Sequence, residues 1–216
     1  MKKFCLVILL SAMALASSAV NLVVKEYLAA AQKEDSEAQY NLGVRYKSGN
    51  GVTKDYEKAV YWFRKSAASG NAKAQWELGY AYATGRGVPK DFKQSVQWYR
   101  KSAEQGHVPG LRKMGVCYYV GYGVPQDYKQ ATYWYRKAAA QGDIIAQVTL
   151  GRCYEHGIGV EKDVKQAIFW YRTAAKKYNK ARETIDKLCF SCAASPVSLV
   201  GECTKIQSSL SAAREK

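Results

Sequence analysis

The chain has 216 residues, of which 48% are hydrophobic and 24% are charged, and its formal net charge is +15. This composition is too apolar for a disordered chain and too polar for a protein with many membrane spans. The 4 prolines and 17 glycines exclude a proline-rich or collagen-like chain, and the length permits one or two domains with a sizeable hydrophobic core.

The first 19 residues have the three parts of a secretory signal peptide. Lys2 and Lys3 form a positive start, an apolar run follows over residues 4–16, and small residues precede a cleavage position after Ala19. An uncleaved membrane anchor is the alternative, because the run can be counted on through Val24 and would then be long enough to span a bilayer. Two serines and an asparagine dilute that run. We therefore expect cleavage and export to the periplasm or out of the cell, with no transmembrane segment after cleavage.

The next part of the chain repeats every 36 residues without an insertion. The predicted repeats are 36–71, 72–107, 108–143 and 144–179. Residues that recur at this spacing include Trp62, Trp98, Trp134 and Trp170, Gly43, Gly79, Gly115 and Gly151, and Asp55, Asp91, Asp127 and Asp163. A period of this length is typical of helical repeat proteins.

Each repeat is expected to contain two helices joined by a glycine-rich turn. Ala38, Leu42 and Tyr46 are four residues apart and share one helical face. The Gly-x-Gly-Val sequence that starts at Gly49 ends the first helix, because glycine readily adopts left-handed backbone conformations, and Asp55 can cap the second helix. A hairpin this short cannot bury its apolar face alone. The pattern therefore predicts an all-α, right-handed α-solenoid of stacked helix-turn-helix repeats.

Within a repeat, two features are assigned to packing. The conserved phase of the tryptophans places them in the core, and Gly43 is expected to leave room for a second backbone to approach. The glycine turns are not a nucleotide-phosphate site, because such a site needs a strand before the glycines.

Both ends of the repeat array are expected to be capped. Residues 20–35 align with a second helix when shifted by one repeat, so they predict an N-terminal capping helix. Residues 180–216 are expected to hold C-terminal capping helices and a tail with cysteines. In that segment, residues 181–190 resemble another first helix, and residues 199–213 are expected to form a last helix.

The repeat motif closely resembles the Sel-1-like repeat, a relative of the tetratricopeptide repeat. In the first unit the motif occupies residues 38–43, 49–52, 55–59 and 62–67, and the resemblance extends over roughly residues 22–190. The resemblance implies a curved superhelix that binds other proteins and carries no catalytic residues. Exported bacterial members are similar to envelope or host-interaction proteins, and cysteine-rich relatives are associated with penicillin binding. Those relatives place cysteine pairs in every unit, whereas the first two units here contain none.

In related superhelices the first helix of each unit lines the concave side. Positions that vary between the repeats on this helix are therefore candidates for partner binding, with neutral variation on a solvated face as the alternative. The candidate residues are Asn41, Trp76, Glu77, Tyr80, Arg112, Lys113, Tyr119 and Arg152.

Five cysteines remain after signal cleavage. Cys117 and Cys153 occupy equivalent positions in successive first helices, which lie roughly 8–10 Å apart, whereas a disulfide needs Cα atoms about 4.4–6.8 Å apart. We therefore expect both to be buried free thiols. Near the C-terminus, one disulfide is predicted, with Cys192–Cys203 as the first choice and Cys189–Cys203 as the second.

The sequence contains no nucleophile with a placed base, no paired carboxylates and no metal signature, so we expect no enzyme, cofactor or metal site. The predicted function is a non-enzymatic protein-interaction scaffold or adaptor in the bacterial envelope. The alternatives are a cell-wall protein of the penicillin-binding or β-lactamase-like kind, and a secreted effector that engages host proteins. The positive charge favours an acidic protein or peptide partner, with an anionic envelope glycan or lipid as the alternative, and nucleic acid is not expected after export.

Overall fold

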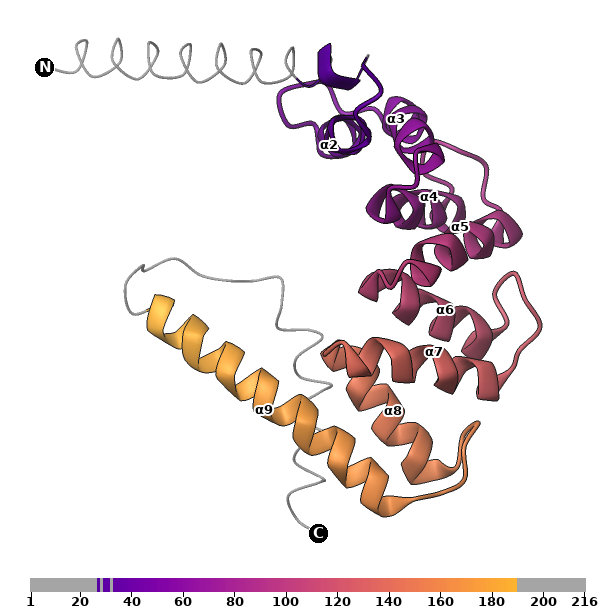
Figure 1. The fold of residues 1–216 in the computed structure, drawn as a ribbon, viewed down its shortest axis with the longest axis vertical. Coiled ribbons are helices and arrows are strands. Elements are labelled where there is room, and N and C mark those ends of the chain that lie inside the picture. The colour runs from indigo at the N-terminus through magenta and orange to yellow at the C-terminus, as the bar shows by residue number, and fades with distance from the viewer. Residues whose placement is uncertain (1–26, 28, 32, 190–216) are drawn as a thin grey trace, which may run out of the picture. The chain divides into compact units, whose positions relative to one another are not determined.

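The computed structural model describes residues 27, 29–31 and 33–189, with side chains up to Lys176 (Figure 1). This part of the chain consists of helices and the turns between them and contains no strand. None of its helices is both long and apolar enough to cross a membrane. Contacts divide the chain into two compact bodies, which are described separately: an N-terminal body up to Gly110 and a C-terminal body from Leu111.

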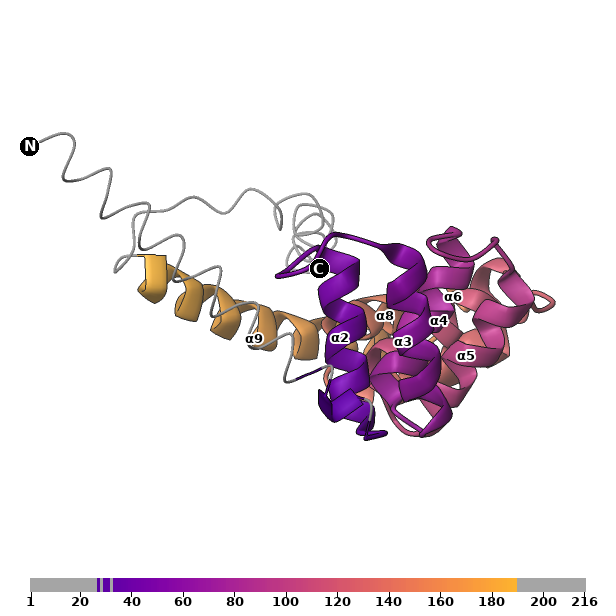
Figure 2. The same cartoon turned by 90° about the horizontal axis from the view of Figure 1, so that it is seen from above.

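The N-terminal body contains the first two helical hairpins. They are formed by α2 (Ser36–Ser48) with α3 (Tyr56–Ala68) and by α4 (Ala72–Thr84) with α5 (Phe92–Glu104), as Figures 1 and 2 show. The helix α6 (Val108–Val120) starts in this body. The remainder of the described chain, in the C-terminal body, comprises the rest of α6 followed by α7 (Tyr128–Ala140), α8 (Ile144–His156) and α9 (Val164–Cys189).

The helix ends follow the sequence signals. The carboxylate of Asp55 accepts a hydrogen bond from the backbone N–H of Lys58 at 2.9 Å and caps α3, as predicted. The helix α2 ends at Gly49, whose φ of 78° lies in the left-handed region, and α4 ends at Gly85 with a φ of 74°. These glycines fix the position of each interhelical turn because other residues adopt this conformation at a cost.

The core repeats with the same period as the sequence. On the first helices, Leu42, Leu78, Met114 and Leu150 are 36 residues apart, and all four are completely buried. On the second helices, the most deeply buried aromatic residues are Phe63, Tyr99, Tyr135 and Tyr171, which are between 2% and 7% exposed. Each body therefore buries one aliphatic and one aromatic side chain per repeat between its helices.

The glycine in the middle of each first helix makes room for an aromatic ring. A Cβ atom added to Gly43 would lie 2.6 Å from the ring of Phe63, and one added to Gly79 would lie 2.5 Å from the ring of Tyr99. We expected Gly43 to accommodate a second backbone. The structure instead brings a side-chain ring of the second helix against the backbone of the first, and the nearest backbone atom is the more distant Ala59 carbonyl oxygen at 3.2 Å.

The tryptophans are less buried than the sequence suggested. Trp134 is 8% exposed, but Trp62, Trp98 and Trp170 are only half-buried. A lysine one turn later covers part of the ring, with the Lys101 ammonium 4.4 Å from the centre of the Trp98 ring. The prediction of a tryptophan core is therefore only partly correct, because the next residue in each repeat takes the central position.

The last described helix differs from the prediction of a separate first helix over residues 181–190. It continues without interruption from Val164 to Cys189, a length of 26 residues. Earlier second helices end near Gly70, Gly106 and Gly142, all with positive φ, but the equivalent position is Tyr178. Without a glycine there, the chain lacks the residue that most readily forms a left-handed cap.

At the N-terminal end, the described part of the predicted capping helix packs on the first repeat. Ala31 is 1% exposed and lies in one cluster with Ala38 and Leu42, and Tyr27 packs against this cluster. The side-chain amide of Gln39 also donates a hydrogen bond to the carbonyl oxygen of Ala31 at 3.1 Å. These contacts cover the outer face of α2 in place of a preceding repeat.

Candidate protein-binding surface

The eight candidate residues are divided between the two bodies. The N-terminal body holds Asn41 on α2 and Trp76, Glu77 and Tyr80 on α4. The C-terminal body holds Arg112 and Tyr119 on α6, together with Lys113 and Arg152. Each set is therefore considered within its own body.

An aromatic and cationic cluster extends from α4 to the start of α3. The rings of Trp76 and Tyr80 are stacked, with centroids 5.8 Å apart and planes inclined by 16°. The guanidinium of Arg86 lies 5.7 Å from the centre of the Tyr80 ring and 5.6 Å from that of Tyr56. The Lys54 ammonium lies 5.0 Å from the Tyr56 ring. We call these five residues the Trp76–Lys54 cluster.

The charge of the Trp76–Lys54 cluster is not neutralised by nearby acids. Among the described residues, neither Arg86 nor Lys54 forms an ion pair with a carboxylate. The side chain of Lys54, by hydrogen bonding, lowers the pKa of the Tyr56 hydroxyl, and the charges of Lys54, Arg86 and Lys47 act in the same direction. The cluster therefore combines three aromatic rings with two cations that can attract a molecule with negative charge.

Trp76 combines an exposed part with a buried one. Its side chain is half-buried, and its Nε1 atom is buried without a hydrogen-bond partner among the described residues. One part of the Trp76 side chain is therefore packed against the protein, and another part is accessible to solvent. This position agrees with both readings of the sequence, a surface anchor and a partly buried side chain.

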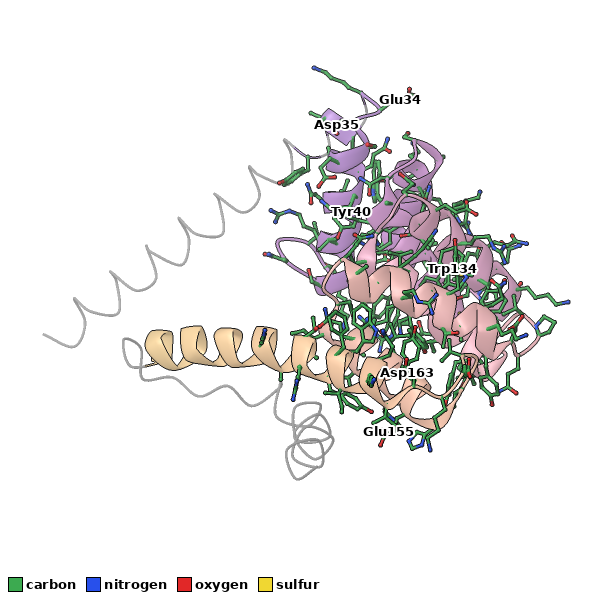
Figure 3. All side chains as sticks on the ribbon, turned by 60° about the horizontal axis from the view of Figure 1, so that its bottom comes forward. Glu34, Asp35, Tyr40, Trp134, Glu155 and Asp163 are labelled. Carbon is green, nitrogen blue, oxygen red and sulfur yellow. The ribbon has the colours of Figure 1, made fainter. Side chains whose placement is uncertain are left out.

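Glu77 does not face solvent as a binding residue would. It is 5% exposed, and its Oε1 atom accepts a hydrogen bond from the ammonium of Lys47 on α2. The neighbouring Tyr40, labelled in Figure 3, has a raised pKa because of burial and then because of the Glu77 charge. Glu77 therefore links the first helices of two successive repeats. Asn41, on the same helix as Lys47, is half-buried.

In the C-terminal body, Arg112 contacts Asp143, the residue that caps the N-terminus of α8. Its Nε atom donates a hydrogen bond to Oδ2 of Asp143 at 3.1 Å, while the other oxygen of that carboxylate accepts from the N–H of Ala146 at 2.8 Å. The ring of Tyr119 meets the ring of Tyr128 edge-on, with centroids 5.3 Å apart. Lys113 is half-buried.

Arg152 is the most accessible candidate in this body, since it is exposed. Arg112 contacts Asp143 and Tyr119 contacts Tyr128, so neither of these contacts is with another candidate residue.

Three residues of the Trp76–Lys54 cluster were missed by the sequence comparison. Arg86 stands at the second position of the Gly-x-Gly-Val turn, where the other repeats have Asn50, Tyr122 and Ile158. Lys54 and Tyr56 flank the capping aspartate of α3. Variation at the turn position was a usable signal, but only variation on the first helix was considered.

The two cysteines whose side chains the structure describes, Cys117 and Cys153, are free and buried, as expected. Cys117 is 5% exposed and Cys153 is 1% exposed. Burial raises the pKa of each thiol to about 11. Cys192 and Cys203, which were predicted to form a disulfide, lie outside the described residues.

An open cavity of about 830 Å³ lies in the C-terminal body beside the turn before α9. It is lined by Arg136, Tyr154 and residues 160–166, and Arg136 donates a hydrogen bond to the Tyr154 hydroxyl at 2.9 Å. The carboxylate of Asp163 (Figure 3) caps α9 by accepting hydrogen bonds from the N–H groups of the first turn. Among the residues that the structure describes, no group of three His, Cys, Asp or Glu side chains could hold a metal ion.

Comparison with known proteins gives a consistent family assignment. A family model described as the Sel1 repeat matches residues 36–71, 72–107, 108–143 and 144–179. No protein with a curated description matches the chain significantly.

Among the solved structures that are similar to this one are two with more than a third of their aligned residues identical. A protective antigen present in uropathogenic Escherichia coli strains, described as displaying an SLR fold, is 40% identical, with a TM-score of 0.72 and coverage of 73% of this chain and 34% of that chain. A Sel1 repeat protein from Oxalobacter formigenes is 37% identical, with a TM-score of 0.68 and coverage of 73% of this chain and 62% of that chain. The chain thus spans about a third and about three fifths of the lengths of these relatives.

The matched repeats cover most of the chain and coincide with the helical hairpins of the structure. Proteins built from this repeat are generally protein-interaction scaffolds and are typically not enzymes. The chain, an all-α solenoid of 36-residue helix-turn-helix units, belongs to the Sel1 repeat family.

Proposed function

We propose that this protein is an exported, non-enzymatic scaffold that binds an acidic protein or peptide at the Trp76–Lys54 cluster, which α4, the turn after it and the start of α3 form. The observation that carries the proposal is the Trp76–Lys54 cluster, in which the described residues supply no carboxylate for Arg86 or Lys54. Rings stacked on one another supply rigid contact area. A preformed arrangement of this kind lowers the ordering cost of binding.

An acidic segment fits this cluster better than a neutral one. A partner carboxylate can pair with the guanidinium of Arg86, which Tyr56 and Tyr80 already hold in place between their rings. Aromatic and arginine side chains are also the types that most often dominate binding energies at protein interfaces. The full chain carries a net charge of +15, and removal of Lys2 and Lys3 with the signal peptide leaves 15 − 2 = +13, which adds a field that attracts acidic partners at a distance.

Export is part of the proposal and is supported by the signal-peptide pattern of the first 19 residues. The E. coli relative is described as a protective antigen, which concerns that protein. A periplasmic adaptor and a secreted, host-directed protein would use the same surface. Cell fractionation, with N-terminal sequencing of the mature chain, tests this part. A chain that keeps Met1 and stays in the cytoplasm would contradict it.

The binding test compares matched variants of the mature chain. Proteins captured from an envelope extract at moderate salt are identified, and the Kd of the strongest is measured by calorimetry for each variant. Arg86→Ala should weaken binding by about tenfold or more, because it removes the central cation of the cluster. Lys101→Ala is the control, since Lys101 also lies over an aromatic ring but on α5, outside the cluster.

Equal affinities of Arg86→Ala and the unchanged protein would contradict the proposed site. So would an equal loss in Lys101→Ala, because that result would indicate attraction by overall charge alone. The penicillin-binding alternative is tested by incubation with a fluorescent penicillin. Covalent labelling of the folded chain would favour that alternative over a scaffold.

A further inference from the structure

The second helix of the fourth repeat has an apolar face that is covered in the earlier repeats. Val60, Val96, Thr132 and Ile168 occupy equivalent positions, 36 residues apart. The first three are 2–4% exposed, but Ile168 is 40% exposed. One turn earlier on the same face, Val164 is 55% exposed, but its equivalent Tyr128 is also 41% exposed, so the difference between repeats lies at Ile168. The position of Ile168 is therefore buried in the three earlier repeats, but no described residue covers it in the fourth.

Within each body, the cover is the first helix of the following repeat, α4 on α3 and α8 on α7. Val60 on α3 belongs to one buried cluster with Leu78 and Ala81 of α4. At the other end of the same face, the side-chain amide of Gln75 on α4 donates a hydrogen bond to the carbonyl oxygen of Ala67 at 3.3 Å. The covering helix thus runs antiparallel to the helix that it covers, because a short turn joins the two.

The same arrangement holds in the C-terminal body between α7 and α8. The side-chain amide of Gln147 on α8 donates to the carbonyl oxygen of Ala139 at 3.0 Å. The Thr132 hydroxyl lies 3.3 Å from the carbonyl oxygen of Gly159, in the turn that follows α8. By analogy, a helix that covers α9 would start beside Ala175, which is the equivalent of Ala139 in the preceding repeat. Ala175 is half-buried, whereas Ala139 is 1% exposed.

We propose that residues 199–213 of this chain form a helix that covers this face of α9. The segment lies outside the described residues, and its sequence places Leu199, Cys203, Ile206 and Leu210 at i, i+4, i+7 and i+11. This spacing gives one apolar helical face. The segment therefore has the pattern of a helix that packs on one side only.

The connection is long enough for this placement. From Cys189 back to Ala175 the helix rises roughly 21 Å, at about 1.5 Å per residue. Residues 190–198 can span about 30 Å when extended, at roughly 3.3 Å per residue. The proposed packing pairs Leu199 with Ala175, Ile206 with Ile168, and Leu210 with Val164. This order is the antiparallel one that α4 adopts on α3.

Covering by the same chain is favoured over covering by a second copy. A tethered segment has an effective concentration in the millimolar range, far above that of a separate molecule. An uncovered end of a repeat array is also a site for end-to-end association, which terminal caps prevent. The proposed helix therefore closes the array and leaves the first helices of the repeats free for a partner.

The experiment is a cysteine cross-link in the mature chain. Cys189, Cys192 and Cys203 are replaced by serine, and Ile168→Cys is combined with Ile206→Cys. Mild oxidation should give an intramolecular disulfide, seen as a monomer on a non-reducing gel and as a linked peptide by mass spectrometry. The control pairs Gln166→Cys with Ile206→Cys. Gln166 is exposed and lies about 200° around the helix from Ile168, so this pair should not link.

A linked dimer from the Ile168→Cys and Ile206→Cys pair would assign the face to a second copy and overturn the proposal. Absence of a link, or equal linking of the control pair, would overturn it as well. A second measurement compares the Tm of variants that carry charged residues at these two positions and no added cysteine. Ile168→Glu and Ile206→Lys should each lower the Tm by several degrees, and the double variant should recover part of the loss. Strictly additive losses would contradict contact between the two residues.

Discussion

The packing of Tyr99 against Gly79 gives the sharpest prediction about stability. A Cβ atom on Gly79 would lie 2.5 Å from Cδ1, 2.7 Å from Cε1 and 2.9 Å from Cγ of the Tyr99 ring, whereas carbon atoms in contact are normally about 3.5–4.0 Å apart. The ring is 2% exposed and therefore has little room to move away. Gly79→Ala should destabilise the chain although alanine is the better helix former.

The expected magnitude follows from two opposing effects. Replacing glycine by alanine inside a helix contributes about 1 kcal/mol of stability. Overpacking a core position costs about 1–3 kcal/mol, and an overlap of this size belongs at the upper end. The net loss is then about 2 kcal/mol. For a chain of this length, that corresponds to a decrease in Tm of roughly 4–8 °C.

The assay is urea unfolding followed by far-UV circular dichroism, in a double-mutant cycle with Tyr99→Leu. In the Tyr99→Leu background, Gly79→Ala should become neutral or stabilising, because the ring that it meets is gone. Gly70→Ala is the control. Gly70 has a φ of 87° and no atom within 4 Å of an added Cβ, so its cost is backbone strain that Tyr99→Leu does not relieve. A stabilising effect of Gly79→Ala in the unchanged protein would refute the packing argument.

Four further predictions concern burial. Thiol labelling of Cys117 and Cys153 at pH 8 should be at least about 100-fold slower in the folded chain than in the unfolded one, because the raised pKa of about 11 suppresses the thiolate. From about pH 9 to pH 11, stability should fall as pH rises, since the thiols ionise more readily in the unfolded state; urea midpoints that stay constant over this range would contradict this. Phe63→Ala should cost about 3–5 kcal/mol, and Trp98→Ala should cost less because its ring is half-buried; the reverse order in urea unfolding would count against the assignment of the core. Lys47→Met should lower the free energy of unfolding by about 1–3 kcal/mol, since it leaves the buried carboxylate of Glu77 on α4 unpaired. In urea unfolding, this loss should be smaller when Glu77→Gln is also present.

Much of the fold was predictable because each repeat carries its own local signals. The aspartate at the start of α3 and the glycine at the end of α2 act within a few residues, so the local sequence was sufficient to predict these helix ends. The period of 36 residues then predicted which residues are equivalent. The completely buried side chains at Leu42 and its three equivalents agree with that alignment.

The candidate site was less predictable, because its contacts join residues that are distant in the sequence. Variation between repeats drew attention to Trp76 and Tyr80, which the structure places in the Trp76–Lys54 cluster, but it selected Glu77 for the same reason. Glu77 is variable because its partner, Lys47, also varies, and the two are paired across 30 residues. Arg86 was missed since its contact with Tyr56 arises only when the turn of one repeat meets the second helix of the previous one.

By itself the sequence determined the class of fold, the boundaries of the repeats and most helix ends, because these depend on periodicity and on backbone preferences within one turn. Only the tertiary structure decided which aromatic side chain of each repeat is central, that Phe63 and not Trp62 fills the space above Gly43, and that Ile168 is left exposed at the end of the described array. The exposed fraction of a side chain depends on the residues that pack against it, and at these positions those residues lie on another helix.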